Sequence, residues 1–259
     1  MTERTSYKLF CGLRIYPAVA GLLGCAVFLI VLEIAVRSDL IPPTVIPRPS
    51  DFIAGMFTLH RKVDFEGAIA ITFGMTALAL FFELLVALPI GYFLAKNKVF
   101  RSAYEGWLAA LFAAPVFLLY PLFMVIFGRN FITLVVMGFI PGVIPMTLQT
   151  MQGFLSVSRT LVKVGHSYGL TEGQIFRKIM IPAAVPGIFT GFRLAVMYTL
   201  INIIGIEYLV DIGGLGRIVS DRYSRFDITG TYAAIIAVIA VSMLFQWLIA
   251  KIERSIRPV

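Results

Sequence analysis

Several polar side chains stand inside long apolar runs, and four of them are the first candidates for chemistry: Glu83, Arg193, Asn202 and Glu207. A charge at the centre of a membrane-spanning helix costs about 2.5–3.5 kcal/mol on insertion scales, so each such residue needs a physical account. Glu83, Asn202 and Glu207 are candidates for lining a polar path through the protein. Hydrogen bonding between helices is the alternative for each. Arg193 lies near one end of its run, where a long side chain can reach the membrane surface.

No arrangement of residues typical of an enzyme accompanies these groups. The sequence contains no Gly-Lys pair, and a phosphate-binding P-loop needs one before a Ser or Thr. HExxH, Cys-x-x-Cys and Gly-x-Ser-x-Gly patterns are absent too. His60 and His166 have no acidic neighbours at ligand spacing, and Cys11 and Cys25 are expected to be inert thiols. We therefore expect no catalytic activity, no bound cofactor and no metal in this chain.

The elements that must position these residues are long apolar helices. The chain is 59% hydrophobic and 14% charged, with a mean hydropathy of +0.91, which does not fit a soluble domain. About 20 apolar residues in a helix cross a hydrocarbon core of roughly 30 Å. Six spans are predicted, at about 15–36, 68–95, 104–127, 131–150, 187–209 and 229–250. The predicted fold class is an all-α integral membrane protein whose first span is retained, because it is too long for a signal peptide.

The net charge of +8 fits a membrane topology better than a nucleic-acid surface. Segments on the same side as the N-terminus carry more Lys and Arg than those on the opposite side. By the positive-inside rule, both termini are expected in the cytoplasm. We expect no nucleic-acid partner.

Prolines interrupt the helical pattern at several places. The four prolines between residues 42 and 49 predict an extended segment on the outer surface, followed by a short helix to about Arg61. Pro115 and Pro121 fall inside the third predicted span, where the backbone hydrogen bonds that they remove require protein neighbours. They are candidates for lining a path, and tolerance of proline between packed helices is an equal alternative.

A polar stretch breaks the apolar pattern at residues 156–188, and GLTEGQIFRKIMIPAAVPGIF, Gly169 to Phe189, covers its second half. Its spacing predicts two short amphipathic helices. Gly169 is predicted to end the first, and Thr171 to cap the second. Pro182 is predicted to end the second helix, and Pro186 to stand where the fifth span begins.

The apolar faces of these two helices, which include Phe176 and Ile179, are expected to be exposed. Exposed Phe and Ile side chains at a membrane surface indicate a binding partner. The stretch is therefore interpreted as a docking element.

The same stretch resembles the cytoplasmic loop of the permease subunits of ATP-binding-cassette (ABC) importers. The signature of that loop is Glu-Ala-Ala, three residues, Gly, nine residues, Ile, any residue, Leu-Pro. Gly169, Ile179 and Pro182 fit the spacing, with Ile181 in place of Leu. At the Glu-Ala-Ala positions stands Lys163-Val-Gly, which reverses the charge of the first residue.

Three further segments are similar to the branch of this family that imports nitrate, taurine, alkanesulfonates and pyrimidine precursors. They are PPTVIPRPSDF, YPLFMVIFG and GGLG, so the resemblance extends over nearly the whole chain. Met75 is a departure, because an Arg is expected there in this branch.

The resemblance implies a type I importer permease fold. Residues 1–66 would hold the N-terminal tail, the first span and a Pro-rich periplasmic segment, and residues 67–253 the permease core, with the coupling loop at about 156–184. In the family this loop fits a cleft of the ATPase subunit. The residues expected to couple to the ATPase are Lys163, His166, Gly169, Leu170, Thr171, Phe176, Ile179 and Pro182. Arg193, tied to this loop, and Gly213 and Gly214 of the GGLG segment are expected to be structural.

The implied partners are two ABC ATPase subunits, which would bind ATP and Mg, a second permease copy, an extracytoplasmic substrate-binding protein and the lipid of the bacterial inner membrane. The expected function is import of a small polar or anionic organic solute of the nitrate, sulfonate, taurine or pyrimidine-like class. An ion-gradient-driven secondary transporter is the alternative. The absence of paired acidic residues and of inverted repeats argues against that alternative. Arg217, Arg222 and Arg225 are expected to dock the binding protein or, alternatively, to attract an anionic solute.

Overall fold

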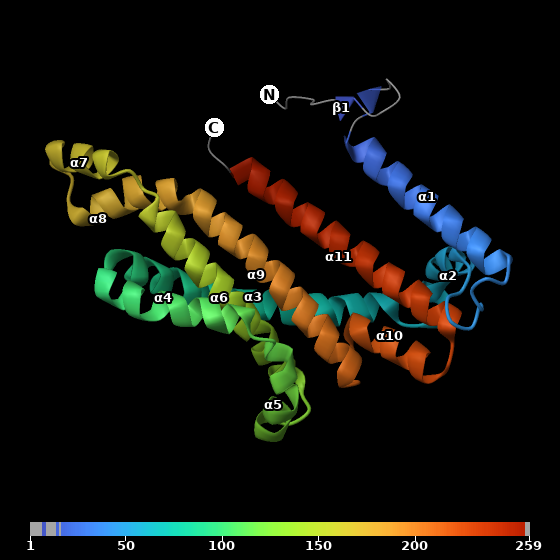
Figure 1. Cartoon of the computed structure of the whole chain (residues 1–259). Helices are drawn as coiled ribbons and strands as arrows, with labels where there is room; N and C mark the ends of the chain where they lie inside the picture. The colour runs from blue at the N-terminus through green and yellow to red at the C-terminus, as the bar shows by residue number, and fades with distance from the viewer. Residues whose placement is uncertain (1–6, 9–13, 16, 257–259) are drawn as a thin grey trace. The chain divides into compact units, whose positions relative to one another are not determined.

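The computed structural model describes residues 7–8, 14–15 and 17–256, and almost all of them are helical (Figure 1). Two short strands, β1 (Tyr7–Lys8) and β2 (Arg14–Ile15), pair antiparallel. The helices are α1 (Pro17–Arg37), α2 (Pro49–Lys62), α3 (Phe65–Lys96), α4 (Lys98–Ala113), the 3₁₀ turn η1 (Val116–Leu119), α5 (Tyr120–Phe127), α6 (Phe131–Leu155), α7 (Arg159–Ser167), α8 (Glu172–Ile175), the π turn η2 (Phe176–Met180), α9 (Ile181–Leu209), α10 (Gly214–Ser224) and α11 (Ile228–Ile256).

The chain forms two units, Met1–Lys62 with Arg222–Ala237 and Val63–Asp221 with Val238–Val259. In the first unit, the Glu33 carboxylate of α1 accepts hydrogen bonds from the backbone N–H and the hydroxyl of Ser50, at 3.1 and 3.0 Å. The rings of Phe52 and Tyr232 stack, and the Tyr232 hydroxyl donates to the Val45 carbonyl at 3.3 Å. These contacts fix the Pro-rich segment between α1 and α2, which is non-helical as predicted.

Five candidate membrane spans lie within the described residues, and they match five of the six predicted spans. They are Val19–Arg37, Phe65–Lys96, Phe131–Leu155, Ile228–Lys251 and a longer helical path, Glu172–Ser224, that includes α9. Proline inside α3, α6 and α9 does not end these helices. Packed neighbours allow a membrane helix to continue through proline.

The third predicted span, at about 104–127, is not one straight helix. α4 ends at Ala113, and Val116–Phe127 continues at an angle of 79° to it. Pro115 has no N–H for the helix ladder, and the residue before a proline avoids the helical region, so Ala114 is extended with ψ 137°. Pro121 falls in the first turn of α5, where no N–H is needed. Counted as one bent span, this pair brings the number of candidate spans to the predicted six.

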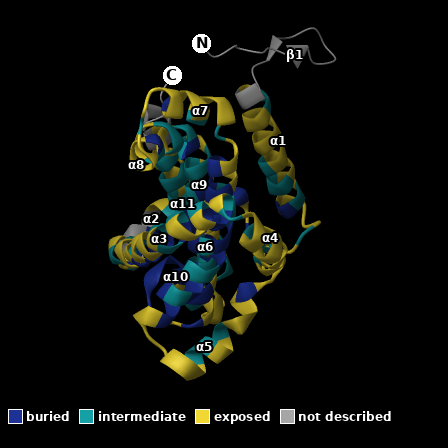
Figure 2. Ribbon diagram, turned by 90° about the vertical axis from the view of Figure 1, so that its left-hand side faces the viewer, coloured by how far each residue is buried: buried dark blue, intermediate teal, exposed yellow. Residues whose placement is uncertain are grey.

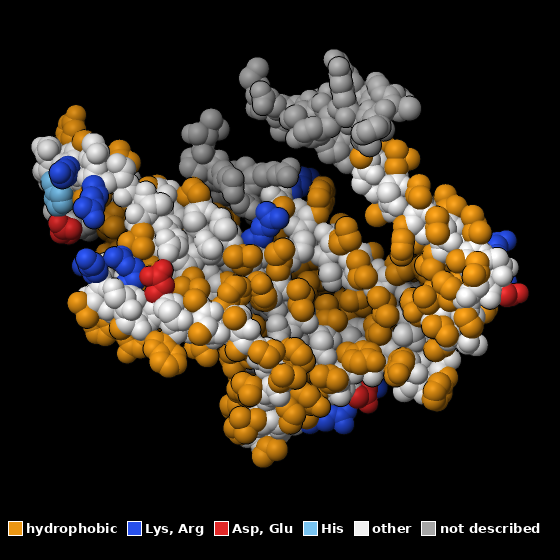
Figure 3. Space-filling model, viewed as in Figure 1, with side chains coloured by type: hydrophobic (Ala, Val, Ile, Leu, Met, Phe, Trp, Pro, Cys, Tyr) orange, Lys and Arg blue, Asp and Glu red, His pale blue; other side chains and the backbone are white. Residues whose placement is uncertain are grey.

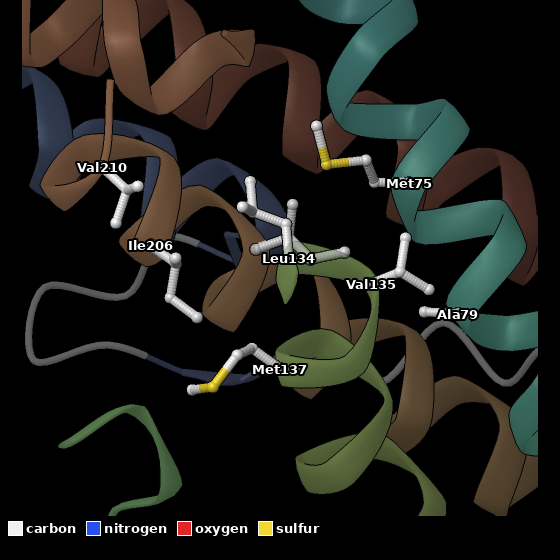
Figure 4. Packing of buried hydrophobic residues seen from close by; sticks show 8 residues of the cluster. Met75, Ala79, Leu134, Val135, Met137, Ile206 and Val210 are labelled. Carbon is white, nitrogen blue, oxygen red and sulfur yellow. The ribbon is translucent and has the colours of Figure 1, made fainter. Parts of the chain in front are cut away.

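The core of the second unit lies where α3, α6 and α9 pack together. Figure 4 shows one cluster at this junction, in which buried side chains of all three helices meet: Met75, Ala79, Leu134, Val135, Met137, Ile203, Ile206 and Val210. α6 is largely buried, whereas α4 has no buried residue (Figure 2). Met75, where the resemblance led us to expect Arg, is 1% exposed and fills this apolar core.

Glycines bring α6 and α9 into close contact. A Cβ atom placed on Gly187 would lie 2.5 Å from the Cα atom of Gly153, and one placed on Gly191 would lie 2.9 Å from the Gln149 side chain. Small residues at such crossings let two membrane helices pack backbone to backbone, which is a main source of their association in lipid. The α6–α9 contact therefore depends on glycine at residues 153 and 187.

We expect Gly187→Ala to destabilise the protein, because its methyl group cannot fit without separating α6 from α9. Overpacking of this kind costs about 1–3 kcal/mol and should lower the unfolding temperature of the detergent-solubilised chain. Gly205→Ala is the matched control on the same helix, since nothing lies within 4 Å of a Cβ there. Equal unfolding temperatures for the two variants would contradict the proposed contact.

Candidate functional site

The polar segment between α6 and α9 folds as a helical hairpin. The Ser158 hydroxyl accepts from the Thr160 N–H at the start of α7, and the chain reverses at Gly169, whose φ is +71°. This left-handed conformation favours glycine. Thr171 then forms a capping box with Gln174: its Oγ1 accepts from the Gln174 N–H, and the Gln174 side-chain oxygen accepts from the Thr171 N–H, at 3.4 and 2.9 Å. The predicted helix end at Gly169 and cap at Thr171 are confirmed.

The prediction that Pro182 ends the second short helix is wrong. α8, η2 and α9 follow one another without a break, and Pro186 lies inside α9 rather than at its start. In the π turn the Ile181 N–H bonds to the Phe176 carbonyl, five residues earlier. Pro182 comes just after this wider turn and lies in the first turn of α9.

The expectation that Phe176 and Ile179 form an exposed face is also wrong. Phe176 is half-buried, with its ring centroid 4.6 Å from that of Tyr92 and 6.1 Å from that of Phe154. Ile179 is half-buried against Gly165 of α7, where an added Cβ would lie 2.8 Å from the Ile179 Cδ1. Both side chains hold the hairpin together and attach it to α3 and α6.

The exposed surface of the hairpin instead comes mainly from α7 and the turn after it. Its apolar members are Leu161, Val164 and Tyr168, of which Tyr168 is 82% exposed. Lys163, His166 and Thr171 are exposed beside them, and Leu170 is half-buried. The His166 Nε2 lies 3.7 Å from a carboxylate oxygen of Glu172, so this ion pair depends on protonation of the histidine. A mixed apolar and basic surface of this kind suits a protein partner.

At the opposite end of α9, Glu207 is fully buried and joined to α3 and α10. Its carboxylate accepts from the Thr72 hydroxyl at 2.7 Å and from the Gly216 N–H at 3.0 Å. The Thr72 oxygen in turn accepts from the Leu215 N–H at 2.9 Å. The carboxylate thereby stands at the N-terminus of α10, where unpaired N–H groups and the helix dipole favour a negative charge.

Gly213 and Gly214 make this arrangement possible. Their φ values are +136° and +86°, both in the region that favours glycine. A Cβ atom on Gly214 would overlap the Glu207 carboxylate. The structural role expected for these two glycines is consistent with this geometry.

Glu83 is buried in the middle of the second unit. Its Oε1 accepts from the Thr199 hydroxyl of α9 at 2.6 Å, and a side chain on Gly142 of α6 would overlap it. Its Oε2 has no hydrogen-bond partner among the residues that the structure describes. A buried acceptor without a partner is costly, so Glu83 is the less completely bonded of the two buried glutamates.

The remaining candidates of the sequence analysis lie apart from these groups. The Asn202 amide donates to the Tyr198 carbonyl of its own helix at 2.8 Å, and it is half-buried. Arg193 is exposed on α9, without a carboxylate partner in the described part of the chain. Pro115 and Pro121 are both exposed.

Sequence reasoning missed the two threonines that partner the buried carboxylates. Thr72 and Thr199 are fully buried, and each donates to a glutamate on another helix. Threonine is common in apolar helices, where its hydroxyl can bond to the backbone of its own helix. The sequence therefore contains no signal that distinguishes these two threonines from their neighbours.

We expect Thr72→Val to loosen the α10 segment, because it leaves the Leu215 N–H and one Glu207 oxygen without their partner. Each such buried loss costs about 1–3 kcal/mol. Limited proteolysis of residues 210–225 should become faster, while Thr72→Ser, which keeps the hydroxyl, should behave as the wild type. Equal proteolysis of the two variants would show that the hydroxyl does not hold α10.

Comparison with known proteins relates this chain to membrane components of transport systems. Residues 87–258 match the family described as binding-protein-dependent transport system inner membrane component. The formylaminopyrimidine transport permease protein ThiX of Halalkalibacterium halodurans is 24% identical over 245 residues, covering 95% of this chain and 97% of the relative. The taurine transport system permease protein TauC of Escherichia coli is 23% identical over 239 residues, covering 90% and 86%.

Solved structures share the fold. An inward-facing structure of the MetNI methionine ABC transporter matches with a TM-score of 0.62 at 20% identity, covering 71% of this chain and 92% of that chain. The match to the family covers most of the present sequence and includes the hairpin, Thr199 and Glu207, whereas Thr72 and Glu83 lie before the matched residues. The chain belongs to the family of inner-membrane components of binding-protein-dependent transport systems, the permeases of ABC importers.

Proposed function

We propose that the chain forms, with a second permease copy, the membrane pathway of an importer for a small polar or anionic organic solute. The proposed substrate class is that of nitrate, sulfonates, taurine and pyrimidine-like compounds. The names of two relatives, which specify formylaminopyrimidine and taurine, support it. Related permeases for osmoprotectants and carnitine are similarly distant, so the relatives support a range of small polar solutes.

The observation that carries the coupling role is the hairpin of residues 156–180. It is braced from inside by Phe176 and Ile179, and it presents Leu161, Val164 and Tyr168 outward. In our proposal the ATPase partner binds this outward surface, with Lys163 and His166 at its edge. The partner binds ATP and Mg and hydrolyses the ATP, whereas this chain contributes a change of conformation and no catalysis.

Closure of two ATPase subunits would then displace each hairpin as a rigid body. Because α6 enters the hairpin and α9 leaves it, the displacement passes directly into the two helices that contain Gly142 and Thr199, the neighbours of Glu83. A partner shifts the populations of two conformations only if its binding free energy differs between them. In this proposal, the ATPase subunits bind the two conformations of the permease with different affinity. Glu83 and Glu207 are buried in the present conformation, so a pathway role for either requires this rearrangement.

In this proposal both termini lie in the cytoplasm of a bacterium, and a substrate-binding protein docks at the opposite membrane surface. Arg217 and Arg222, which the sequence offered for docking or for attracting anions, are paired with Asp211 and Asp227 at 2.5 and 3.2 Å. Each of these two arginines has an acidic partner within the chain, although Asp211 also pairs with Arg129 at 3.5 Å. This favours docking of the binding protein by shape over capture of an anion by these arginines.

The tagged chain, solubilised in a mild detergent and purified by affinity, tests the partners. We expect a P-loop ATPase to co-purify in an equimolar amount, together with any second permease that completes the dimer; mass spectrometry would identify both. The permease with no added tag serves as the background control. Solute uptake that persists without the ATPase but collapses with the proton gradient would instead support a secondary transporter.

Gly169→Ala should uncouple ATP hydrolysis from transport. Nothing lies within 4 Å of a Cβ at this position, so the only change is the strain of φ +71°. A left-handed conformation costs a non-glycine residue about 1–2 kcal/mol, equal to roughly a tenfold change in the population of the turn. Solute uptake by reconstituted vesicles should fall severalfold, while ATP hydrolysis persists.

Gly173→Ala is the matched control, because it adds the same methyl group to open space two residues after Thr171 and has ordinary helical backbone. It should transport normally. If both variants transport as the wild type does, the geometry of the turn is not part of coupling.

A further inference from the structure

A basic pocket lies at the base of the hairpin, within the second unit. It has a volume of about 590 Å³ and lies between the end of α3, the start of α4, the end of α6 and α7. Its basic lining residues are Lys96, Lys98, Arg101, Arg159, Lys163 and His166. Figure 3 shows Lys and Arg side chains gathered over α7, α8 and the start of α4.

These positive charges are not balanced by acidic residues of the described chain. No carboxylate lines the pocket, and none lies within 4.0 Å of a charged nitrogen of its lysines or arginines among the side chains that the structure describes. The nearby Glu105 bonds to Gln152 at 3.3 Å, and Glu172 faces His166 outside the pocket. One nitrogen of Arg101 donates to the Ala95 carbonyl and caps α3, leaving the rest of the guanidinium available. The pocket therefore favours an anion.

The other half of the lining is apolar. It comprises Ala95, Phe154, Leu155, Val157, Val162 and Met180. A pocket for an inorganic anion or for an acidic side chain needs no such surface. An amphipathic ligand, with a charged head and a hydrocarbon stem, satisfies both halves of the lining.

The position of the pocket in the membrane points to the same kind of ligand. The long spans α3 and α6 end beside it, at Lys96 and Leu155, which is the depth at which lipid headgroups lie. The next turns of α4 expose Phe100, Tyr104 and Trp107, the last to 72%. Exposed aromatic residues beside basic ones are typical of a segment at the membrane–water interface.

We propose that this pocket binds the phosphate of an anionic phospholipid, with the glycerol and the first acyl carbons against its apolar side. Basic pockets between membrane helices on the cytoplasmic side are known to hold lipid headgroups. The bound lipid joins the α3–α4 turn to α7, and its single negative charge reduces the mutual repulsion of the five lysines and arginines that line the pocket. Lys163 lines the pocket at its border with the surface proposed for the ATPase, and for this reason it is not among the residues changed in the test below. This inference does not rest on the proposed substrate or ATPase.

The full-length chain, purified and stripped of lipid by detergent exchange, tests the proposal. Its affinity for dioctanoyl phosphatidylglycerol should exceed that for dioctanoyl phosphatidylcholine by at least about tenfold. In the variant Lys96→Gln/Lys98→Gln/Arg159→Gln, phosphatidylglycerol binding should weaken by about tenfold or more, since each basic residue near a membrane surface contributes to the attraction. Arg101 is left in place because it caps α3.

Lys251→Gln is the matched control, because it removes an exposed positive charge near the end of the last span but outside the pocket. It should bind phosphatidylglycerol as the wild type does. If the triple variant fails to fold, the single variants Lys98→Gln and Arg159→Gln, both at exposed side chains, provide the same comparison.

Three outcomes would overturn the proposal. Equal affinity for the two lipids would show that the pocket does not select a negative charge. Displacement of phosphatidylglycerol by an equal concentration of inorganic phosphate would identify a site for a free anion. Unchanged lipid binding by the triple variant, together with loss of a co-purifying ATPase, would identify the basic residues as a protein contact.

Discussion

The close approach of α6 and α9 at Gly153 and Gly187 is the contact on which the second unit depends. In lipid there is no hydrophobic force to press two apolar helices together, so van der Waals contact at small residues must do it. The contact lies two residues before the end of α6 and six residues after the start of α9, at the base of the hairpin. The hairpin therefore emerges from a clamped pair of helices and cannot tilt without moving both. This is the mechanical property that a coupling element requires.

The π turn of residues 176–180 lies just before Pro182, a residue that would disrupt a regular α-helix at this position. A straight α-helix through this position would lack a hydrogen bond and would place the ring against the preceding turn. The π turn widens the helix just before this proline, and it begins at Phe176, whose ring packs in a cluster with those of Tyr92 and Phe154. One local irregularity thus keeps the hairpin continuous with α9 and supplies the aromatic contact that braces it. Such turns are often found at functional sites.

Features governed by local rules were predictable from the sequence. The spans followed from apolar length, and the caps at Gly169 and Thr171 followed from residues whose preferences act over one turn of helix. The errors arose where a local rule competes with packing. Pro182 was assigned the end of a helix, and Phe176 was placed on an exposed face.

The hydrogen-bond partners of Glu83 and Glu207 were beyond prediction for another reason. Each bond crosses between helices that are more than 100 residues apart, and Thr72 and Thr199 look no different in the sequence from other threonines. The sequence identified the two glutamates because an ionisable side chain is costly to place inside a membrane span. Only the packing of α3 against α9 shows that threonine hydroxyls offset this cost by hydrogen bonding. The basic pocket is similar, because its residues come from the α3–α4 turn and α7, which the sequence separates by some 60 positions.

α9 connects the two ends of this unit. At a rise of about 1.5 Å per residue, its 29 residues extend about 43 Å, from the π turn below the hairpin to the Glu207 network that holds α10. Both ends are anchored by specific contacts, with aromatic rings and glycine at one and a buried carboxylate at the other. Between them lies Glu83, with one carboxylate oxygen bonded to Thr199 of α9 and the other without a described partner. A displacement of α9 along its axis would therefore act directly on the Thr199–Glu83 hydrogen bond, because the apolar packing around it tolerates small shifts better than a buried carboxyl group tolerates a lost hydrogen bond.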